Sequence, residues 1–270
     1  MDRERLKKIF QDTLAFSTEN EFLRKKTEEM CYRTRLFYSQ FEDLQPENKS
    51  EVPNIEIIED TTFHCASQYV SENKVAVLNF ANAFHPGGGV VNGAMAQEEC
   101  LCRSGNLYNA LTVPYINKNY YLWNNKYCGN LGTDAVIYSP GVTVFKTDDT
   151  YPVLMDMDQW FEVDVLTCAA PYYDLNVRHP LPLDKLEKVF YKRNKNILEI
   201  ASYNRADVLV LGAFGCGAFN NPPDLVAGTF RKLLIDEKYA LRFKKVLFAI
   251  KKNNASNTNL TAFKEVFENI

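Results

Sequence analysis

Two adjacent glutamates, Glu98 and Glu99, follow a run of three glycines, Gly87, Gly88 and Gly89. Carboxyl groups deliver and remove protons in acid–base catalysis. Glycines let backbone amides approach a ligand closely, because no Cβ stands in the way. Neighbouring residues on a helix point about 100° apart, so one glutamate can face a ligand while the other braces the loop. The pattern predicts an anion-binding cradle beside an acid.

The helix that begins near these glutamates sets a condition on their chemistry. Its positive end favours ionised carboxylates, whereas a general acid must hold its proton, which burial or a nearby anionic ligand can arrange. A simpler interpretation is a glycine turn followed by a capped, solvent-exposed helix. Taken alone, the glycine run and the carboxylate pair do not decide between these two interpretations.

A second glycine loop spans residues 212–221 and repeats the order of strand, glycine turn and helix. Its glycines leave amides free to close over a phosphate, and the following helix adds its positive end. The loop lacks the Lys-Ser/Thr ending of a nucleotide P-loop and the spacing of a dinucleotide-binding turn. One of Phe214 and Phe219 is expected to pack inward while the other lines a ribose or a base. In an open α/β sheet both glycine loops would meet at the carboxyl edge of the strands.

The charge balance excludes several classes of function. The chain carries 34 acidic and 31 basic residues and a net charge of −3, so no general basic surface attracts nucleic acid, and sequence-specific binding of it is not expected. An anionic substrate must therefore be held locally by amides and a few cations. No apolar stretch approaches the roughly 18 residues of a membrane span, and the charged residues 1–5 do not resemble a signal peptide.

Seven cysteines and three histidines are scattered along the chain. The odd cysteine count and the absence of a secretion signal predict reduced thiols and a cytoplasmic protein. Cys100 and Cys102 have the wrong spacing for a zinc knuckle, and His64, His85 and His179 are far apart in sequence. We therefore expect no metal site, no cofactor and no catalytic cysteine.

The first part of the chain is predicted to be helical and charged. Apolar residues recur at helical spacing in two groups: Leu6, Ile9, Phe10 and Leu14, then Leu23, Met30, Phe37 and Phe41. Residues 43–53, which contain two prolines, form the natural linker. We expect a helical N-terminal extension at 1–50 packed on a catalytic domain at 51–270.

From residue 55 onward, strands alternate with helices. We expect strands at 55–58, 75–80, 135–138, 142–145, 163–171, 206–211 and 245–250, and helices at 94–110, 182–204, 222–234 and 260–270. A short helix is expected after residues 60–62. Continuous apolar strands separated by helices predict an α/β fold whose parallel or mixed sheet is covered on both faces.

Taken together, these motifs resemble those of the poly(ADP-ribose) glycohydrolase family. Gly87-Gly88-Gly89, then seven residues, then Gln97-Glu98-Glu99 is similar to the family's GGG-X-QEE signature. Segments 79–82, 168–171 and 215–219 also match, in the same order. The pattern is most similar to the compact microbial-type branch. The resemblance implies a macrodomain-like three-layer α/β/α sandwich with a mixed central sheet, and it covers 51–270 better than the first 50 residues.

The resemblance implies a role for each matching residue. Glu99 would protonate the departing ribose oxygen, Glu98 would hold the adjacent ribose hydroxyl or the loop, and Gln97 would orient the signature. Asn82 would hydrogen-bond a ribose hydroxyl, and the glycine run would bracket the distal ribose. The diphosphate and the ribose beside it would be held by Gly215, Cys216, Gly217, Ala218 and Phe219. For the adenine, only the region of Phe248 and Ile250 is suggested.

The implied activity is the release of ADP-ribose from poly(ADP-ribose) by a monomeric enzyme without a metal. A ribose–ribose bond breaks through an oxocarbenium-like transition state, so its leaving oxygen must be protonated. Two alternatives stay open. One is a reader module that binds ADP-ribose without cleaving it. The other is a hydrolase of another ADP-ribosyl linkage, to a protein, a nucleic acid or a small ester. The intact carboxylate pair argues against a reader, because binding alone requires no acid.

Overall fold

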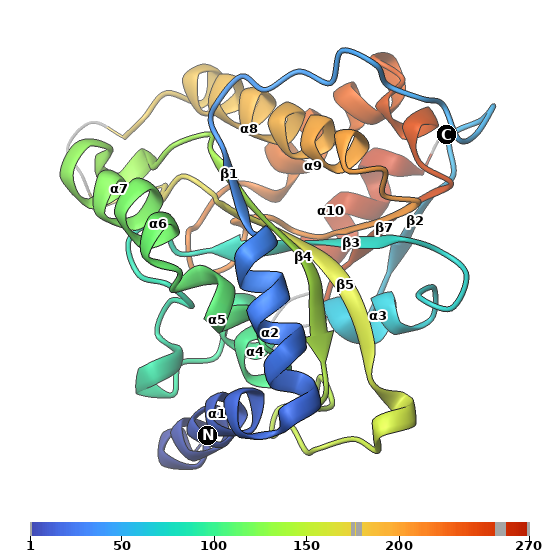
Figure 1. The fold of residues 1–270 in the computed structure, drawn as a ribbon. Coiled ribbons are helices and arrows are strands. Elements are labelled where there is room, and N and C mark those ends of the chain that lie inside the picture. The colour runs from blue at the N-terminus through green and yellow to red at the C-terminus, as the bar shows by residue number, and fades with distance from the viewer. Residues whose placement is uncertain (1, 174–175, 177–179, 252–257, 269–270) are drawn as a thin grey trace.

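A seven-stranded sheet runs through the centre of the computed structural model, which describes residues 2–173, 176, 180–251 and 258–268 (Figure 1). Across the sheet the strands follow the order β1 (Arg35–Phe37), β4 (Val136–Val144), β5 (Phe161–Ala169), β3 (Val75–Ala81), β6 (Val208–Leu211), β7 (Lys245–Ala249) and β2 (Ile55–Ile58). The last five in this order run parallel, whereas β4 pairs antiparallel with both β5 and β1. The expected mixed sheet is confirmed.

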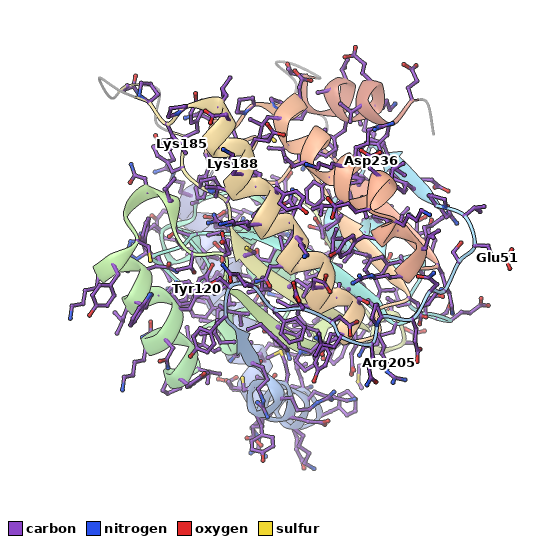
Figure 2. All side chains as sticks on the ribbon, turned by 90° about the horizontal axis from the view of Figure 1, so that it is seen from above. Glu51, Tyr120, Lys185, Lys188, Arg205 and Asp236 are labelled. Atoms are coloured by element: carbon purple, nitrogen blue, oxygen red, sulfur yellow. The ribbon has the colours of Figure 1, made fainter. Side chains whose placement is uncertain are left out.

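Helices cover both faces of the sheet, because the central strands are buried on each side (Figure 1). One layer contains α8 (Leu183–Tyr203), α9 (Pro223–Arg231) and α10 (Thr258–Phe267), whose apolar residues join one core cluster. Figure 2 shows α8 crossing the sheet when the molecule is seen from above. The opposite layer contains α1 (Arg3–Glu19), α2 (Glu21–Arg33), α3 (Thr62–Ser67), α4 (Gln97–Ser104) and α5 (Leu107–Leu111). This is the expected three-layer α/β/α sandwich.

The N-terminal segment contributes buried residues to the second layer. Leu6, Phe10 and Leu23 are almost fully buried. A Cβ added at Gly93 would lie 2.3 Å from the carbonyl oxygen of Arg3, so the start of α1 rests on the loop that precedes α4. The domain boundary at residue 50 stays a prediction.

The second N-terminal helix is shorter than its apolar spacing indicated. α2 ends at Arg33, and Phe37 belongs to the edge strand β1. The ring of Phe37 packs edge-on against Phe41, with centroids 5.0 Å apart, and both rings contact Tyr203 of α8. The aromatic spacing therefore reflects a contact with the sheet's other layer rather than a helix.

The expectation of one helix over 94–110 is wrong, because the chain breaks between α4 and α5. Gly105 has an extended backbone, and a Cβ there would lie 2.5 Å from the carbonyl oxygen of Thr143. The buried side chain of Asn106 then accepts from Thr143 N at 2.8 Å and donates to Thr27 Oγ1 at 2.9 Å. These contacts join the break to β4 and α2.

Two further segments differ from their sequence interpretation. The strands expected at 135–138 and 142–145 are one strand, β4, with an irregularity between Ser139 and Val142. Asp164 accepts from Gly141 N at 3.0 Å and holds this irregularity inside the sheet. Residues 114–127, for which no helix was expected, are helical: α6 (Pro114–Ile116), a π-helical turn (Asn117–Tyr121) and α7 (Leu122–Tyr127) follow one another.

No helix in the described part of the chain is both long enough and apolar enough to cross a membrane. The last expected helix is present as α10, and residues 269–270 of its expected range lie outside the described residues. His179 also lies outside them. Of the other two histidines, His64 pairs with Asp60 through Nδ1 at 2.8 Å, and His85 is exposed.

Candidate active site

The carboxyl ends of the parallel strands meet at a pocket of about 590 Å³. Its walls come from the ends of β3, β5, β6, β7 and β2, together with the start of α4, as expected for an open α/β sheet. The lining residues are Asp60–Thr62, Phe80–Asn82, Met95–Leu101, Asp148–Thr150, Ala170, Ala213, Gly215, Gly217–Phe219, Ala249–Lys251 and Asn259.

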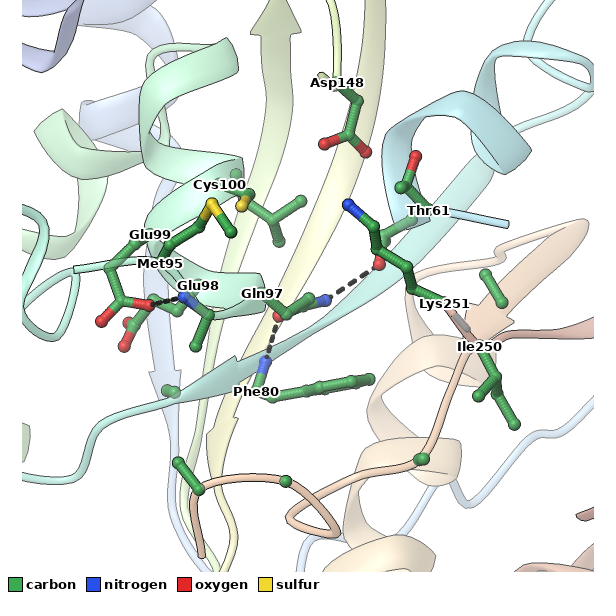
Figure 3. Close-up of a pocket in the computed structure, with 18 of the residues that line it drawn as sticks. Thr61, Phe80, Met95, Gln97, Glu98, Glu99, Cys100, Asp148, Ile250 and Lys251 are labelled. Carbon is green, nitrogen blue, oxygen red and sulfur yellow. Dashed lines mark hydrogen bonds between the residues drawn. The ribbon is translucent and has the colours of Figure 1, made fainter. Parts of the chain in front are cut away.

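Gln97 fixes the start of α4 to the sheet. Its Oε1 accepts from Phe80 N at 2.8 Å, and its Nε2 donates to Leu78 O at 2.7 Å and to Thr62 Oγ1 at 3.0 Å (Figure 3). The side-chain amide of Gln97 therefore hydrogen-bonds to both β3 and α3. This geometry supports the orienting role that the family resemblance implied for Gln97.

Glu99 is held by two backbone amides at the beginning of the helix. Its Oε1 accepts from Gly89 N at 2.9 Å, and its Oε2 accepts from Ala96 N at 2.8 Å. A Cβ added at Gly88, whose φ is +59°, would lie 2.5 Å from Glu99 Oε1 and 3.1 Å from Glu98 Oε2. The glycine at position 88 is therefore required by the protein's own carboxylates.

Glu98 is even more deeply buried than Glu99, with 3% of its surface exposed. It accepts from Asn82 N at 2.7 Å and from Asn79 Nδ2 at 3.3 Å. Burial raises the pKa of Glu98 to about 8, the charge of Glu99 adds to this rise, and the two hydrogen bonds oppose it. At neutral pH one of the two adjacent carboxyl groups in the ligand-free site is therefore largely protonated.

The raised pKa predicts how stability depends on pH. Folding favours protonated Glu98, because its pKa of about 8 exceeds the roughly 4.3 of an exposed glutamate. This contribution is present in full below about pH 4 and is lost as the pH rises through about 8. From pH 5 to 9, the urea midpoint of the wild type should fall more steeply than that of Glu98→Gln. Glu72→Gln changes an exposed glutamate and is the control, so its urea midpoint should vary with pH as that of the wild type does. If the midpoints of all three proteins vary with pH in the same way, Glu98 is not a buried, protonated group.

The glycines of the second loop serve two different purposes, packing and exposure. Gly215 has a φ of +75°, and a Cβ there would lie 2.4 Å from Ala170 Cβ. Asn221 Nδ2 donates to Pro171 O and Gly215 O, which closes the loop against β5. In contrast, a Cβ added at Gly217 would meet no atom within 4 Å. Gly217 therefore presents its bare backbone to the pocket, as an anion site requires.

Comparison with known proteins places this geometry in a family. The model of the microbial-type PARG catalytic domain, where PARG is poly(ADP-ribose) glycohydrolase, matches residues 6–147. The chain belongs to the microbial-type PARG family. The crystal structure of the Thermomonospora curvata PARG is similar at 30% identity and a TM-score of 0.83, covering 98% of this chain and 100% of that one. A search of the curated proteins gave no match.

Solved PARG structures with bound ligands are also similar to this chain. The Thermomonospora curvata PARG bound to the inhibitor ADP-HPD is 31% identical over 96% of this chain and 98% of that one, with a TM-score of 0.82. The Deinococcus radiodurans PARG in complex with ADP-ribose is 34% identical over 90% and 96%, with a TM-score of 0.77. The macrodomain-like fold expected from the resemblance is thereby confirmed.

This member of the PARG family brings most of its sequence-predicted site residues to one pocket. Those that line it are Asn82, Gln97, Glu98, Glu99, Gly215, Gly217, Ala218 and Phe219. The glycines of the first loop and Cys216 are not among the lining residues. A Cβ at Gly87 would lie 2.7 Å from the ring of Tyr108, so this glycine serves internal packing. Burial raises the pKa of the Cys216 thiol to about 12, which keeps it protonated and a poor nucleophile.

The structure also distinguishes the aromatic residues near the PARG pocket. Phe214 is fully buried and Phe219 lines the pocket, as one of the two was expected to do. Phe248 cannot stack on a base, because it is buried between Phe230 and Phe263, whereas Ile250 lines the pocket. Asn82 uses its Oδ1 to accept from Phe84 N and His85 N, which shapes the loop that follows β3.

Sequence reasoning missed the pocket wall formed by residues 60–62, 148–150 and 251. Figure 3 shows the Lys251 side chain reaching toward Asp148 and Thr61, and the Phe80 ring lying across the pocket between Gln97 and Ile250. Asp148 Oδ2 accepts from Phe63 N at 2.9 Å. Position at the end of β3 was an available signal for Phe80. Residues 148–150 follow an antiparallel strand, so no rule about parallel strand ends indicated them.

Proposed function

We propose that this chain hydrolyses the ribose–ribose O-glycosidic bonds of poly(ADP-ribose) and releases ADP-ribose, with Glu99 as the general acid. The observation that carries the proposal is the pair of buried carboxyl groups at the start of α4. They line a pocket whose opposite wall is the exposed backbone of Gly217 and Ala218. A carboxyl pair beside an anion cradle suits a substrate that joins ribose to a diphosphate. Membership of the PARG family supports the same activity.

The reaction needs two proton transfers at Glu99. Protonated Glu99 donates to the oxygen that leaves C1 of the ribose, and the C1–O bond breaks with oxocarbenium character. The diphosphate held by the 215–219 loop stabilises the developing positive charge and favours a protonated carboxyl nearby. Water then attacks C1 from the open face and gives its proton to the Glu99 carboxylate, which restores the acid. All of these steps use groups of this chain, the substrate and water.

The remaining residues position the substrate in this scheme. Glu98, fixed by Asn82 N and Asn79, would accept from or donate to the hydroxyl next to the reacting carbon. Asn82 lines the pocket and would direct its Nδ2 to a ribose hydroxyl, since its Oδ1 is already used. Gly215, Cys216, Gly217 and Ala218 would supply the backbone of the diphosphate cradle, and Phe219 would press on the neighbouring ribose. The ring of Phe219 is itself braced edge-on by Tyr172, with centroids 6.0 Å apart.

The decisive experiment compares defined substrates. Purified protein is incubated separately with poly(ADP-ribose) of known length and with a mono-ADP-ribosylated protein, and the products are identified by mass spectrometry. We expect free ADP-ribose from the polymer. Release from only the mono-ADP-ribosylated protein would assign a different linkage, and tight binding without any release would assign a reader.

A further inference from the structure

The chain contains a long segment without acidic residues directly after the catalytic glutamates. No Asp or Glu occurs between Glu99 and Asp134, although the whole chain carries 34 of them. The segment does contain Lys118 and Lys126 and is rich in asparagine and aromatic residues. A surface built from it carries no carboxylate of its own to repel a polyanion.

Residues 114–127 of this segment form α6, the π-helical turn and α7, which lie at one side of the molecule near the end of β3 (Figure 1). Their outer face exposes large apolar side chains: Leu122 is 56%, Trp123 52% and Tyr127 58% exposed. The rings of Trp123 and Tyr127 have centroids 4.5 Å apart, and Lys126 Nζ lies 4.9 Å from the centroid of Tyr127. We call Leu122, Trp123, Lys126 and Tyr127 the aromatic platform.

The inner face of the same helices packs behind the catalytic end of the pocket. Tyr120 Oη accepts from Ala169 N at 3.1 Å, at the end of β5. Tyr121, the next residue, is also buried, and burial and then the charge of Glu98 raise the pKa of its phenol well above the usual value. This helical segment therefore has a buried side that contacts the end of β5 and an exposed side that carries the platform.

Two more contacts join the platform to the loops that border the pocket. Asn125 Nδ2 donates to Phe84 O at 2.9 Å, in the loop after β3. Tyr172 N donates to Asn130 O at 2.8 Å, and the Tyr172 ring braces Phe219. The segment that carries the platform thus contacts both the loop after β3, which supplies Asn82 to the pocket, and the residues after β5.

We propose that the aromatic platform binds the poly(ADP-ribose) chain beyond the unit held in the pocket, by stacking adenine on Trp123 and Tyr127 and attracting diphosphate through Lys126. This inference rests on the proposed function. Exposed aromatic rings beside cations are what a flexible chain of bases and phosphates requires, because every base has a face to stack. The lack of carboxylates favours a polyanion over a protein partner, and the contacts with the segments after β3 and β5, which border the pocket, favour the substrate itself.

The test compares two substrates of the same pocket. One is long poly(ADP-ribose), and the other is ADP-ribose that carries a small chromogenic leaving group on its anomeric oxygen and cannot reach the platform. For the double variant Trp123→Ala/Tyr127→Ala we expect kcat/KM on the polymer to fall about 5- to 10-fold, the lower range for lost base stacking. The loss should appear in KM, and kcat/KM on the small substrate should stay within about twofold.

Matched variants make the outcome decisive. Tyr32→Ala removes the side chain of a tyrosine on α2 that is 80% exposed, and kcat/KM should not change on either substrate. Lys126→Glu should weaken binding of the polymer, which raises KM, and should reduce the dependence of that KM on salt concentration. If Trp123→Ala/Tyr127→Ala loses kcat/KM equally on both substrates, or leaves KM for the polymer unchanged, the platform does not bind the polymer. Platform-dependent binding of single-stranded oligoadenylate with unchanged polymer turnover would assign the surface to nucleic acid instead. If the wild type cleaves neither substrate, the proposed function itself fails.

Discussion

The Glu99→Gln variant is expected to bind ADP-ribose with nearly wild-type affinity and to turn over poly(ADP-ribose) roughly 10²- to 10⁴-fold more slowly. Glutamine keeps the shape of the side chain but has no proton to deliver to the leaving oxygen. Affinity should change little, because the product is held mainly through its diphosphate and ribose hydroxyls. The measurements are kcat at saturating polymer and the Kd of ADP-ribose by calorimetry.

The hydrogen bonds of Glu99 determine the control for this variant. Both carboxylate oxygens accept backbone amides, from Gly89 and Ala96. A glutamine nitrogen cannot accept, so one amide loses its partner at a cost of about 1–3 kcal/mol. A lower Tm is therefore expected, and turnover should be measured well below it.

Glu98→Gln is the matched variant, since it changes the neighbouring carboxyl in the same way. Its proposed task is to position the ribose in both the ground and transition states, so binding and turnover should fall together. The pKa of Glu98, raised to about 8 by burial, makes this residue the main rival for the role of acid. If Glu98→Gln is inactive with intact affinity while Glu99→Gln keeps its turnover, the acid is Glu98.

The second large effect is expected from Gly217→Val, which should weaken ADP-ribose binding by about 10²- to 10⁴-fold. The new side chain would occupy the space above the cradle and remove about two hydrogen bonds to a charged group, at 1.5–3 kcal/mol each. The fold should persist, because a Cβ at this position meets no protein atom within 4 Å. Calorimetry gives the affinity, and circular dichroism with thermal melting tests the fold.

Neighbouring positions in the same loop provide the contrast for Gly217. Cys216→Ser changes a thiol that lies outside the pocket lining, so affinity and turnover should stay within about twofold. Gly215→Val should instead destabilise the protein, since its Cβ would overlap Ala170. If Gly217→Val binds ADP-ribose with unaltered affinity, this loop does not bind the diphosphate. Complete loss of turnover in a well-folded Cys216→Ser enzyme would make the thiol essential.

Much of the fold could be predicted because its strands are short, apolar and bounded by glycine or proline. The strands around Val77 and Val210 are fully buried between two helical layers, so their sequence shows a continuous apolar run. The mistakes concern contacts across the fold. Gly105 breaks a good helical pattern because the backbone of Thr143 lies against it, and no local pattern encodes that neighbour. Phe37 follows the spacing of a helix but packs on Tyr203.

The site was predictable where one segment supplies both a motif and its geometry. Glu98 and Glu99 at a helix start, and glycines after buried strands, could be interpreted without the structure. Which glycine serves which purpose could not, because Gly88 and Gly217 look alike in sequence. One accommodates a carboxylate and the other faces open space. The separate fates of Phe248 and Ile250 likewise depend on where β7 ends, because Phe248 lies inside the strand and Ile250 follows its last residue, Ala249.

The pocket is assembled from segments that are far apart along the chain, with lining residues from Asp60 to Asn259. During synthesis on the ribosome, the strands β3 and β5 would be complete long before β7 and α10 emerge to close the wall. A nascent chain lacking the last quarter would carry both glutamates and yet have no closed cavity in which to hold ADP-ribose. Ligand protection against proteolysis should therefore appear only after release of the full chain, which makes ADP-ribose a reporter of completed folding for this enzyme.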